Sequence, residues 1–307
     1  MVAAFLARVR ALATPVCGSL DFARKQVATA FATAAVAAIC SLAGHARAWG
    51  PEGHSVIAEI AQRRLTPAAS AAVSKILGRG VSLASVAMWA DDVRPGRPET
   101  YNWHFVNIPL EDSSYDAALH CAATPKGDCV VAELERLRNE LRCAPTDVAQ
   151  NQALRFAVHF VADLHQPMHT LREKQGGNQV LVATYIAGAT CTGRCTPTPT
   201  STNLHAVWDT TILSKAAWDW GALVEIVEKN LPQYVQGASP SSEPRDWAIE
   251  THGVAKSVWA ATPANGVIDE DYYRMALPVA LQQLGRGGVR LAAFLNDAYG
   301  NTACPVR

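Results

Sequence analysis

Apolar residues recur every three or four positions along most of this chain, and capping residues mark where helices begin. Thr66-Pro67 places a capping hydroxyl ahead of a proline at the first helical position, and Gly78 ends the alanine-rich segment that follows. Thr146 likewise precedes a segment that runs through Leu164 with apolar residues at helical spacing. These patterns predict helices over residues 67–77, 82–92, 131–142, 147–164, 204–217, 242–258, 270–284 and 287–298.

One segment has the pattern of a strand instead. Around Gln179–Tyr185, β-branched residues follow Gly176-Gly177, which predicts a pair of short strands. No linker, low-complexity stretch or internal repeat divides residues 49–307. The expected class is therefore all-α: a single, mostly helical domain over 49–307 with a small β-hairpin.

Residues 1–48 have the parts of a signal peptide. Arg24-Lys25 forms a basic region, an apolar run from about Val27 to Leu42 follows, and Ala46-Arg47-Ala48 supplies the small residues that a signal peptidase needs. The run is too short for a membrane anchor to be the better interpretation. We expect cleavage directly before Trp49, export to the periplasm or the medium, and no stable association with a membrane.

Removal of the signal peptide changes the charge of the chain. Five of the 27 basic residues and one of the 27 acidic residues lie in residues 1–48, so 22 basic and 26 acidic residues remain, a net charge of −4. Proteins that bind nucleic acid through a basic surface have the opposite balance. Any attraction for an anionic substrate must come from another source, and bound metal is the obvious candidate.

Six of the eight cysteines remain after cleavage, since Cys17 and Cys40 lie in the signal peptide. An even number in an exported chain favours disulfides over free thiols, and six cysteines permit 15 connectivities. Only Cys191–Cys195, inside one loop, can be predicted as a pair. A cysteine zinc site is the alternative, but no paired C-x-x-C spacing supports it.

Two pairs of histidine and aspartate carry the strongest chemical signal. His159 and Asp163 are four residues apart, as are His205 and Asp209, so each pair projects from one face of its helix. An isolated pair of this kind is more often structural than functional. The presence of two such pairs indicates that two helices contribute ligands to one site.

Further donors surround these helices. The chain leaves the helix before Pro167, which lets His169 fold back from a loop toward the pairs. Asp91 lies near a helix end, and His104 lies in a segment that we expect to be extended. Nitrogen and carboxylate ligands without thiolates suit zinc, at about 2.0–2.2 Å from each donor atom.

Cleavage before Trp49 would create one more donor. The free α-amine and the carbonyl oxygen of Trp49 can close a five-membered chelate ring on a metal ion, and His54 is near enough in sequence to bind the same ion. A tryptophan near a mature amino terminus is usually only a buried anchor. Its position directly behind a cleavage site, together with both helical pairs, favours the metal interpretation.

The remaining histidines of the mature chain lack such neighbours. His120 and His252 are interpreted as structural or solvent-facing. His165 lies between expected ligands, and we expect it to orient them through hydrogen bonds without binding metal.

These residues occur in short motifs that together resemble the zinc-dependent, single-strand-specific nucleases of fungi and plants. The motifs occur in that family's order from Trp49 to about residue 213, whereas the carboxy-terminal third carries none. They are Trp49-Gly50 with His54, Trp89-Ala90-Asp91, His104-Phe105, the segment from His159 to His169, Gly176-Gly177-Asn178 and Asn203-Leu204-His205-Ala206-Val207-Trp208-Asp209.

The resemblance implies three Zn²⁺ ions and a grouping of their ligands. Asp163 would bridge two of the ions and thereby take a direct part in catalysis. The first ion would be held by Asp91, His104, His159 and Asp163, the second by the amine and carbonyl of Trp49 with His54 and Asp163, and the more open third by His169, His205 and Asp209.

The resemblance also implies a pocket for one base. Phe105 matches the family's stacking aromatic residue, and Asn178 and Val180 would complete the pocket. Asn107 stands where relatives often have an aspartate that binds the base. Arg94 matches a basic residue proposed to stabilise the transition state, although an ion pair with Asp91 or Asp92 is an alternative role.

The implied reaction is hydrolysis of phosphodiester bonds in single-stranded DNA and RNA to 5′-phosphorylated products, with 3′-mononucleotides as further substrates. Bridged zinc ions lower the pKa of bound water, and a third ion can stabilise the leaving oxygen. Stacking on Phe105 favours an unpaired base, because duplex bases already stack on each other. We expect a monomer.

Two other functions remain open at this point. A zinc-dependent phospholipase C, as found in bacteria, is a distant relative that also uses an amino-terminal tryptophan and three metal ions. The motifs around His104, Asn178 and His205 favour the nuclease. A zinc-binding or storage protein without activity is the second alternative, and the open third ion argues against it.

Overall fold

Helix boundaries follow the capping residues of the sequence. The computed structural model describes residues 49–185, 199–300 and 304. Helix α3 spans Pro67–Leu77, and the Thr66 hydroxyl accepts a hydrogen bond from the Ala69 amide. Helix α8 spans Asp147–Leu164, where Thr146 caps Ala149 in the same way. Both predicted helices are confirmed. The predicted signal peptide and the predicted Cys191–Cys195 disulfide lie outside the described residues.

Three further segments predicted as helical, 131–142, 204–217 and 242–258, are helical with altered details. Segment 204–217 is divided into α9 (Leu204–Ala206), a π-helical turn (Val207–Thr211) and α10 (Ile212–Ala216). Three α-helices of the described residues were not predicted, namely α2 (Pro51–Gln62), α6 (Ala117–His120) and α11 (Trp220–Tyr234). The predictions at 131–142 and 242–258 are confirmed as α7 (Val130–Cys143) and α12 (Pro244–Ala260).

The prediction of one helix over 82–92 is wrong. The segment forms two short helices, α4 (Leu83–Val86) and α5 (Trp89–Val93). Between them, the Ala87 carbonyl accepts a hydrogen bond from His159 Nδ1 at 2.7 Å. A tertiary contact to a buried histidine thus accompanies the interruption of the local helix.

The prediction of separate helices over 270–284 and 287–298 is also wrong, because one helix, α13, spans Glu270–Gly300. The glycines where the two predicted segments meet provide close packing and do not end the helix. A Cβ atom on Gly287 would lie 3.0 Å from Ile57 Cδ1, and one on Gly288 would lie 2.6 Å from Ile60 Cβ.

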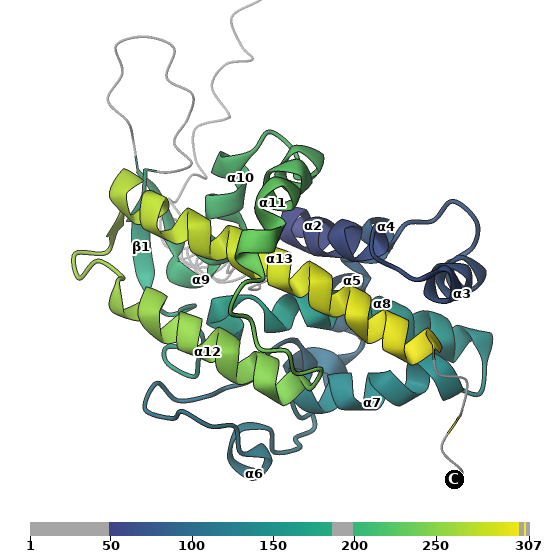
Figure 1. Ribbon diagram of the computed structural model, residues 1–307. Helices are drawn as coiled ribbons and strands as arrows, with labels where there is room; N and C mark the ends of the chain where they lie inside the picture. Colours follow the sequence, from purple (N-terminus) through teal and green to yellow (C-terminus); the bar gives the residue numbers. More distant parts are fainter. Residues whose placement is uncertain (1–48, 186–198, 301–303, 305–307) are drawn as a thin grey trace, which may run out of the picture. The chain divides into compact units, whose positions relative to one another are not determined.

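Helix α13 runs across the helical core (Figure 1). It packs against α2, α8 and α11, and residues from all four helices form the continuous apolar core. Helices α2 and α8 also contact each other. This packing matters for the site because α2 and α8 carry His54, His159 and Asp163.

Replacement of Gly288 by alanine is expected to lower the free energy of unfolding by about 1–3 kcal/mol, because the added methyl group overpacks the contact with Ile60. Gly253→Ala is the matched control. Gly253 lies inside α12 with no atom within 4 Å of an added Cβ, so alanine there should stabilise by up to about 1 kcal/mol. Urea unfolding of both variants measures the difference. Equal stabilities would contradict the close packing of α13 on α2.

The predicted strand at Gln179–Tyr185 is confirmed as β1 (Leu181–Thr184), but the sheet has three strands. Antiparallel pairing joins β1 to β2 (Thr200–Asn203), with Leu181 opposite Asn203. Parallel pairing joins β1 to β3 (Val267–Ile268). The chain is therefore mostly helical with a small sheet, and β2 leads directly into α9.

Two disulfides connect described cysteines. Cys121 is bonded to Cys129 across a short loop, and Cys143 at the end of α7 is bonded to Cys304. Among the described residues, no helix combines the length and apolar character that crossing a membrane requires.

Candidate metal centre

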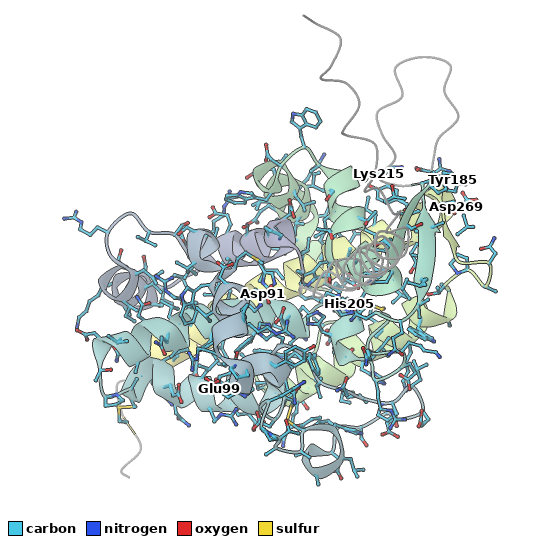
Figure 2. All side chains as sticks on the ribbon, turned by 180° about the vertical axis from the view of Figure 1, so that it is seen from behind. Asp91, Glu99, Tyr185, His205, Lys215 and Asp269 are labelled. Carbon is cyan, nitrogen blue, oxygen red and sulfur yellow. A yellow bond between two sulfur atoms is a disulfide. The ribbon has the colours of Figure 1, made fainter. Side chains whose placement is uncertain are left out.

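Eight side chains predicted as metal ligands converge in the interior of the fold. All are at least nine-tenths buried, and the candidate donor atoms within each group lie within 4.8 Å of one another. In Figure 2, Asp91 and His205 lie among the central helices, whereas Lys215 and Tyr185 lie near the edge. The first group is Asp91 with His104 and His159, the second is His54 with His159 and Asp163, and the third is His169 with His205 and Asp209.

Helix α8 connects the first two groups. His159 and Asp163 lie one turn apart on its buried face, with His159 Nε2 3.2 Å from Asp163 Oδ2. His104 Nδ1 lies 3.0 Å from the same oxygen, and Asp91 Oδ1 lies 3.8 Å from His159 Nε2. Helix α2 brings His54 Nε2 to 3.4 Å from Asp163 Oδ1. Asp163 is therefore placed where it can bridge two ions.

His104 does not come from an extended segment, as predicted. It is the last residue of a 3₁₀ helix over Pro98–His104. Pro98 begins this helix with a residue suited to its first turn, and the backbone becomes extended only at Phe105. The helix turns the imidazole of His104 inward, while Phe105 remains half-buried beside it.

The third group is built from a helix and a tight turn. His205 and Asp209 lie four residues apart, with Nε2 3.5 Å from Oδ2. As predicted, the chain leaves α8 before Pro167, and a 3₁₀ turn over Pro167–Thr170 returns His169 to the site. The His169 and His205 ring centroids are 5.0 Å apart.

The amino-terminal end of the described chain is held against this third group. Trp49 is fully buried, and the Gly50 amide donates a 2.7 Å hydrogen bond to the Asp209 carbonyl. A side chain at position 50 would not fit, because its Cβ would lie 2.6 Å from Thr210 Cγ2. The Gly50 carbonyl also accepts a hydrogen bond from the His54 amide, so the residue directly after Trp49 is fixed between His54 and Asp209.

Backbone carbonyls determine which ring nitrogen carries the hydrogen in three of the histidines. The Nδ1 atoms of His159, His169 and His205 donate hydrogen bonds of 2.7 Å to the carbonyls of Ala87, His104 and Gly176 respectively. In the neutral ring, Nε2 then carries a lone pair, and in His159 and His205 it faces carboxylate oxygens. Two acceptors at this distance repel each other unless a proton or a metal cation lies between them, and a metal ion fits this arrangement.

Several buried atoms of the groups have no hydrogen-bond partner among the described residues. They are both ring nitrogens of His54, Oδ2 of Asp91, Nε2 of His104 and Oδ1 of Asp163. Unpaired buried acceptors are costly unless a cation binds them. The donor set therefore fits divalent metal ions with a preference for nitrogen and oxygen ligands.

Electrostatics in the groups are dominated by burial. Burial lowers the pKa of His54 and His104 to about 4 and that of His205 to about 3, so these rings are neutral at pH 7. Burial also raises the pKa of Asp209 well above its usual value, so this carboxylate needs a nearby cation to ionise.

His159 and Asp163 form a strongly coupled pair. Burial opposes protonation of His159, but the charges of Asp163 and Asp91 outweigh it and raise the pKa to about 9. Burial alone would raise the pKa of Asp163, but His159 and His169 hold it well below its usual value. A divalent ion could bind where His159 would otherwise hold its proton.

Arg94 lies beside Asp91 of the first group. Its Nη1 is 3.8 Å from Asp91 Oδ1, its Nη2 donates to the Tyr101 carbonyl at 3.3 Å, and its guanidinium lies 4.1 Å from the Tyr101 ring centroid. The contact with Asp91 is consistent with the ion-pair interpretation. It also places a cation next to the metal-binding groups.

The residues predicted to bind a base lie on two backbone segments that contact the site. The Val106 amide donates to the His169 carbonyl, which holds Phe105 and the exposed Asn107 near the third group. Gly176 adopts φ +59° and has no room for a side chain against Met168. Half-buried Asn178 and Val180 follow this turn.

Sequence reasoning missed one residue of the site and misplaced another. Gln166 is fully buried and donates from Nε2 to Asp209 Oδ1 at 2.5 Å. His165 does not orient the ligands, because its nitrogens contact the Val161 carbonyl and Arg290. Two residues beyond Asp163, it points to the far side of the helix.

The two isolated histidines are structural. His252 lies between the carbonyls of Thr170 and Pro109, and His120 Nε2 lies 2.8 Å from Asp112 Oδ2. Both are buried, so neither is solvent-facing.

Comparisons with known proteins agree with these motifs. A family model described as S1/P1 nuclease matches residues 49–300. Endonuclease 2 of Arabidopsis thaliana is 30% identical over 283 residues, covering 82% of this chain and 91% of the relative. Nuclease S1 of Aspergillus oryzae is 26% identical over 288 residues (85% and 95%), and nuclease P1 of Penicillium citrinum is 27% identical over 281 residues (82% and 98%).

Proposed function

Because the chain belongs to the S1/P1 nuclease family and is therefore a hydrolase of nucleic acids, we propose that it is a zinc-dependent endonuclease specific for single strands. Its substrates would be single-stranded DNA and RNA, cut to 5′-phosphorylated products, and 3′-mononucleotides. The observation that carries the proposal is the convergence of three buried His and Asp groups. In the two groups around Asp163, several buried atoms have no hydrogen-bond partner among the described residues.

The residues divide into three metal sites. The first ion would be bound by Asp91, His104, His159 and Asp163, and the second by His54, Asp163 and the amine and carbonyl of Trp49. The third would be bound by His169, His205 and Asp209. When bound, Zn²⁺ supplies an activated water and neutralises charge on the phosphate oxygens.

The protein contributes orientation and charge. Asp163 would hold two ions together with one carboxylate, and the carbonyls of Ala87, His104 and Gly176 keep three imidazoles in the ligand tautomer. Gln166 keeps Asp209 turned toward His205. Arg94, beside Asp91, would stabilise negative charge that develops on the phosphate.

Single-strand specificity would come from Phe105. This half-buried ring follows the ligand His104 directly, so a base stacked on it would lie beside the metal ions. A duplex must unstack a base to make that contact, whereas a single strand need not. Asn107, Asn178 and Val180 would line the same pocket.

Export is supported by two features of the chain. Both disulfides fit an oxidising compartment, and the family match begins at Trp49, directly after the proposed cleavage site. We propose that residues 1–48 are removed, that the enzyme acts in the periplasm or the medium, and that it is a monomer.

A parallel assay tests the function. The mature enzyme should hydrolyse single-stranded DNA faster than duplex DNA and should not hydrolyse phosphatidylcholine vesicles. EDTA should abolish the activity and added Zn²⁺ should restore it, because the water nucleophile depends on metal. Product release is measured for each substrate. Turnover of lipid alone would identify a phospholipase C, and bound metal without turnover of any substrate would identify a storage protein.

A further inference from the structure

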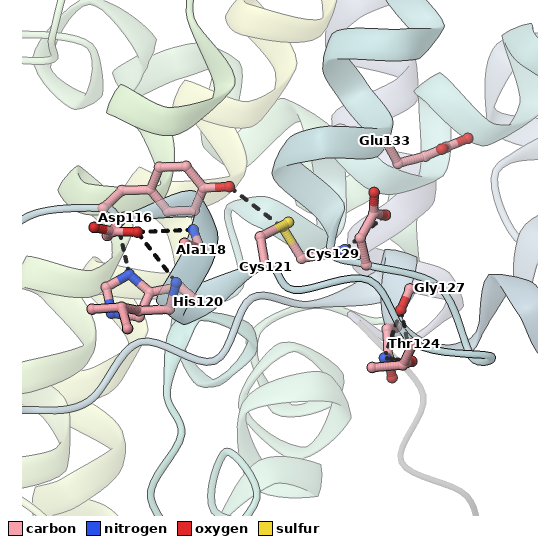
Figure 3. Close-up of a disulfide and its surroundings, with 12 residues drawn as sticks. Asp116, Ala118, His120, Cys121, Thr124, Gly127, Cys129 and Glu133 are labelled. Atoms are coloured by element: carbon pink, nitrogen blue, oxygen red, sulfur yellow. Dashed lines mark hydrogen bonds between the residues drawn. A yellow bond between two sulfur atoms is a disulfide. The ribbon is translucent and has the colours of Figure 1, made fainter.

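A short loop closed by a disulfide presents a lysine beside the site. The Cys121–Cys129 bond closes the loop, and a tight turn from Thr124 to Gly127 forms its tip (Figure 3). We propose that Lys126, in this turn, binds a backbone phosphate of a polynucleotide next to the bond that is cut. The inference rests on the proposed function and adds a subsite that a mononucleotide would not use.

The turn is held in one conformation by several contacts. The Thr124 hydroxyl donates to the Gly127 carbonyl at 2.8 Å, and the Asn102 side chain donates to the same carbonyl at 3.0 Å. The Asn102 amide donates to the Lys126 carbonyl at 2.8 Å. Gly127 has φ +94°, and a Cβ there would lie 2.5 Å from the Glu99 carbonyl oxygen. The backbone of Lys126 is therefore fixed against the 3₁₀ helix Pro98–His104.

That 3₁₀ helix connects Lys126 to the metal site. Lys126 Nζ lies 5.0 Å from the centroid of the Tyr101 ring, and Arg94 lies 4.1 Å from the same centroid. The Tyr101 ring meets Phe105 edge to face, with centroids 6.1 Å apart. Lys126 thus contacts Tyr101, Tyr101 contacts Phe105, and Phe105 directly follows the candidate ligand His104.

The charge of Lys126 is available to a substrate. Its side chain is exposed, and the ion pairs of the described residues do not include it. Nearby arginines differ, since Arg136 pairs with Asp128 and Arg97 pairs with Glu99. A cation next to an exposed and a half-buried aromatic ring, here Tyr101 and Phe105, is a combination suited to single-stranded nucleic acid, with a phosphate on the cation and a base on a ring. A mildly acidic chain would otherwise repel the strand outside its metal site.

Kinetics on two substrates test the inference. Lys126→Ala should raise KM for a single-stranded thymidine oligomer about 3–10-fold at low salt, with kcat within about twofold of wild type. The slope of log(kcat/KM) against log salt should fall in magnitude by about 0.7, as expected for one lost phosphate contact. Values of kcat/KM for 3′-AMP should not change, because this substrate does not reach Lys126.

Two variants complete the experiment. Lys229→Ala removes the same charge from an exposed position on α11 and should leave both substrates unaffected. Lys126→Arg should retain the wild-type KM. If Lys126→Ala matches Lys229→Ala on the oligomer, or loses activity equally on both substrates, the subsite does not exist. If the wild-type enzyme cuts neither substrate, the proposed function itself is wrong.

Discussion

Replacement of His159 by alanine is expected to remove two of three bound zinc ions and to lower kcat/KM on single-stranded DNA by at least about 10³-fold. His159 Nε2 belongs to two of the three donor groups, so its loss affects both ions bridged by Asp163. Changes that only disturb ligand orientation already cost roughly 10–100-fold, and loss of a ligand should cost more. Elemental analysis and initial rates measure the two effects.

His120→Asn is the control for this variant. His120 is also buried and also faces an aspartate, but it lies outside the three groups. It should keep all three ions and near wild-type rates at a temperature where circular dichroism shows both variants folded. Unchanged metal content in His159→Ala would refute the assignment of the first two groups.

Retention of one residue before Trp49 is expected to remove one zinc ion and to reduce activity by about 100-fold or more. An amide nitrogen replaces the free amine, and amides do not serve as ligands to zinc as amines do. The start of the mature chain is also fixed in place, because Trp49 is fully buried and the Gly50 amide is bonded to the Asp209 carbonyl. The comparison is between a protein that starts at Trp49 and one that starts at Ala48.

The same single residue added after Arg307 is the control, and it should change neither metal content nor rate. Full activity and three ions in the protein that starts at Ala48 would show that the Trp49 amine binds no metal. In that case His54 and Asp163 would hold the second ion with other partners.

The candidate site was partly predictable from local spacing, because four of its eight side-chain donors follow a helical periodicity. Four-residue spacing on α8 and in the segment from His205 to Asp209 places each pair on one helix face, whatever the rest of the fold. The capping hydroxyls of Thr66 and Thr146 are equally local signals. Predictions from such local signals hold in the structure because no long-range contact competes with them.

Most of the wrong predictions concern long-range contacts. The break near Ala87 depends on a histidine 72 residues away, and the glycines of α13 fit side chains of α2. His104 was assigned to an extended segment because its 3₁₀ helix has no strong apolar pattern. The connectivity of Cys121, Cys129, Cys143 and Cys304 could not be chosen among 15 pairings, because it follows from how the helices pack.

The bond between Cys143 and Cys304 divides the metal donors into two sets. It closes a covalent ring across 161 residues, and a ring of that size restricts the unfolded chain by about 5 kcal/mol. His169, His205 and Asp209 all lie within the ring, whereas His54, Asp91 and His104 precede it. On unfolding, only the third group would keep all its ligands on one closed loop. In the first and second groups, ligands from the free amino-terminal segment must instead meet ligands within the ring each time the chain refolds.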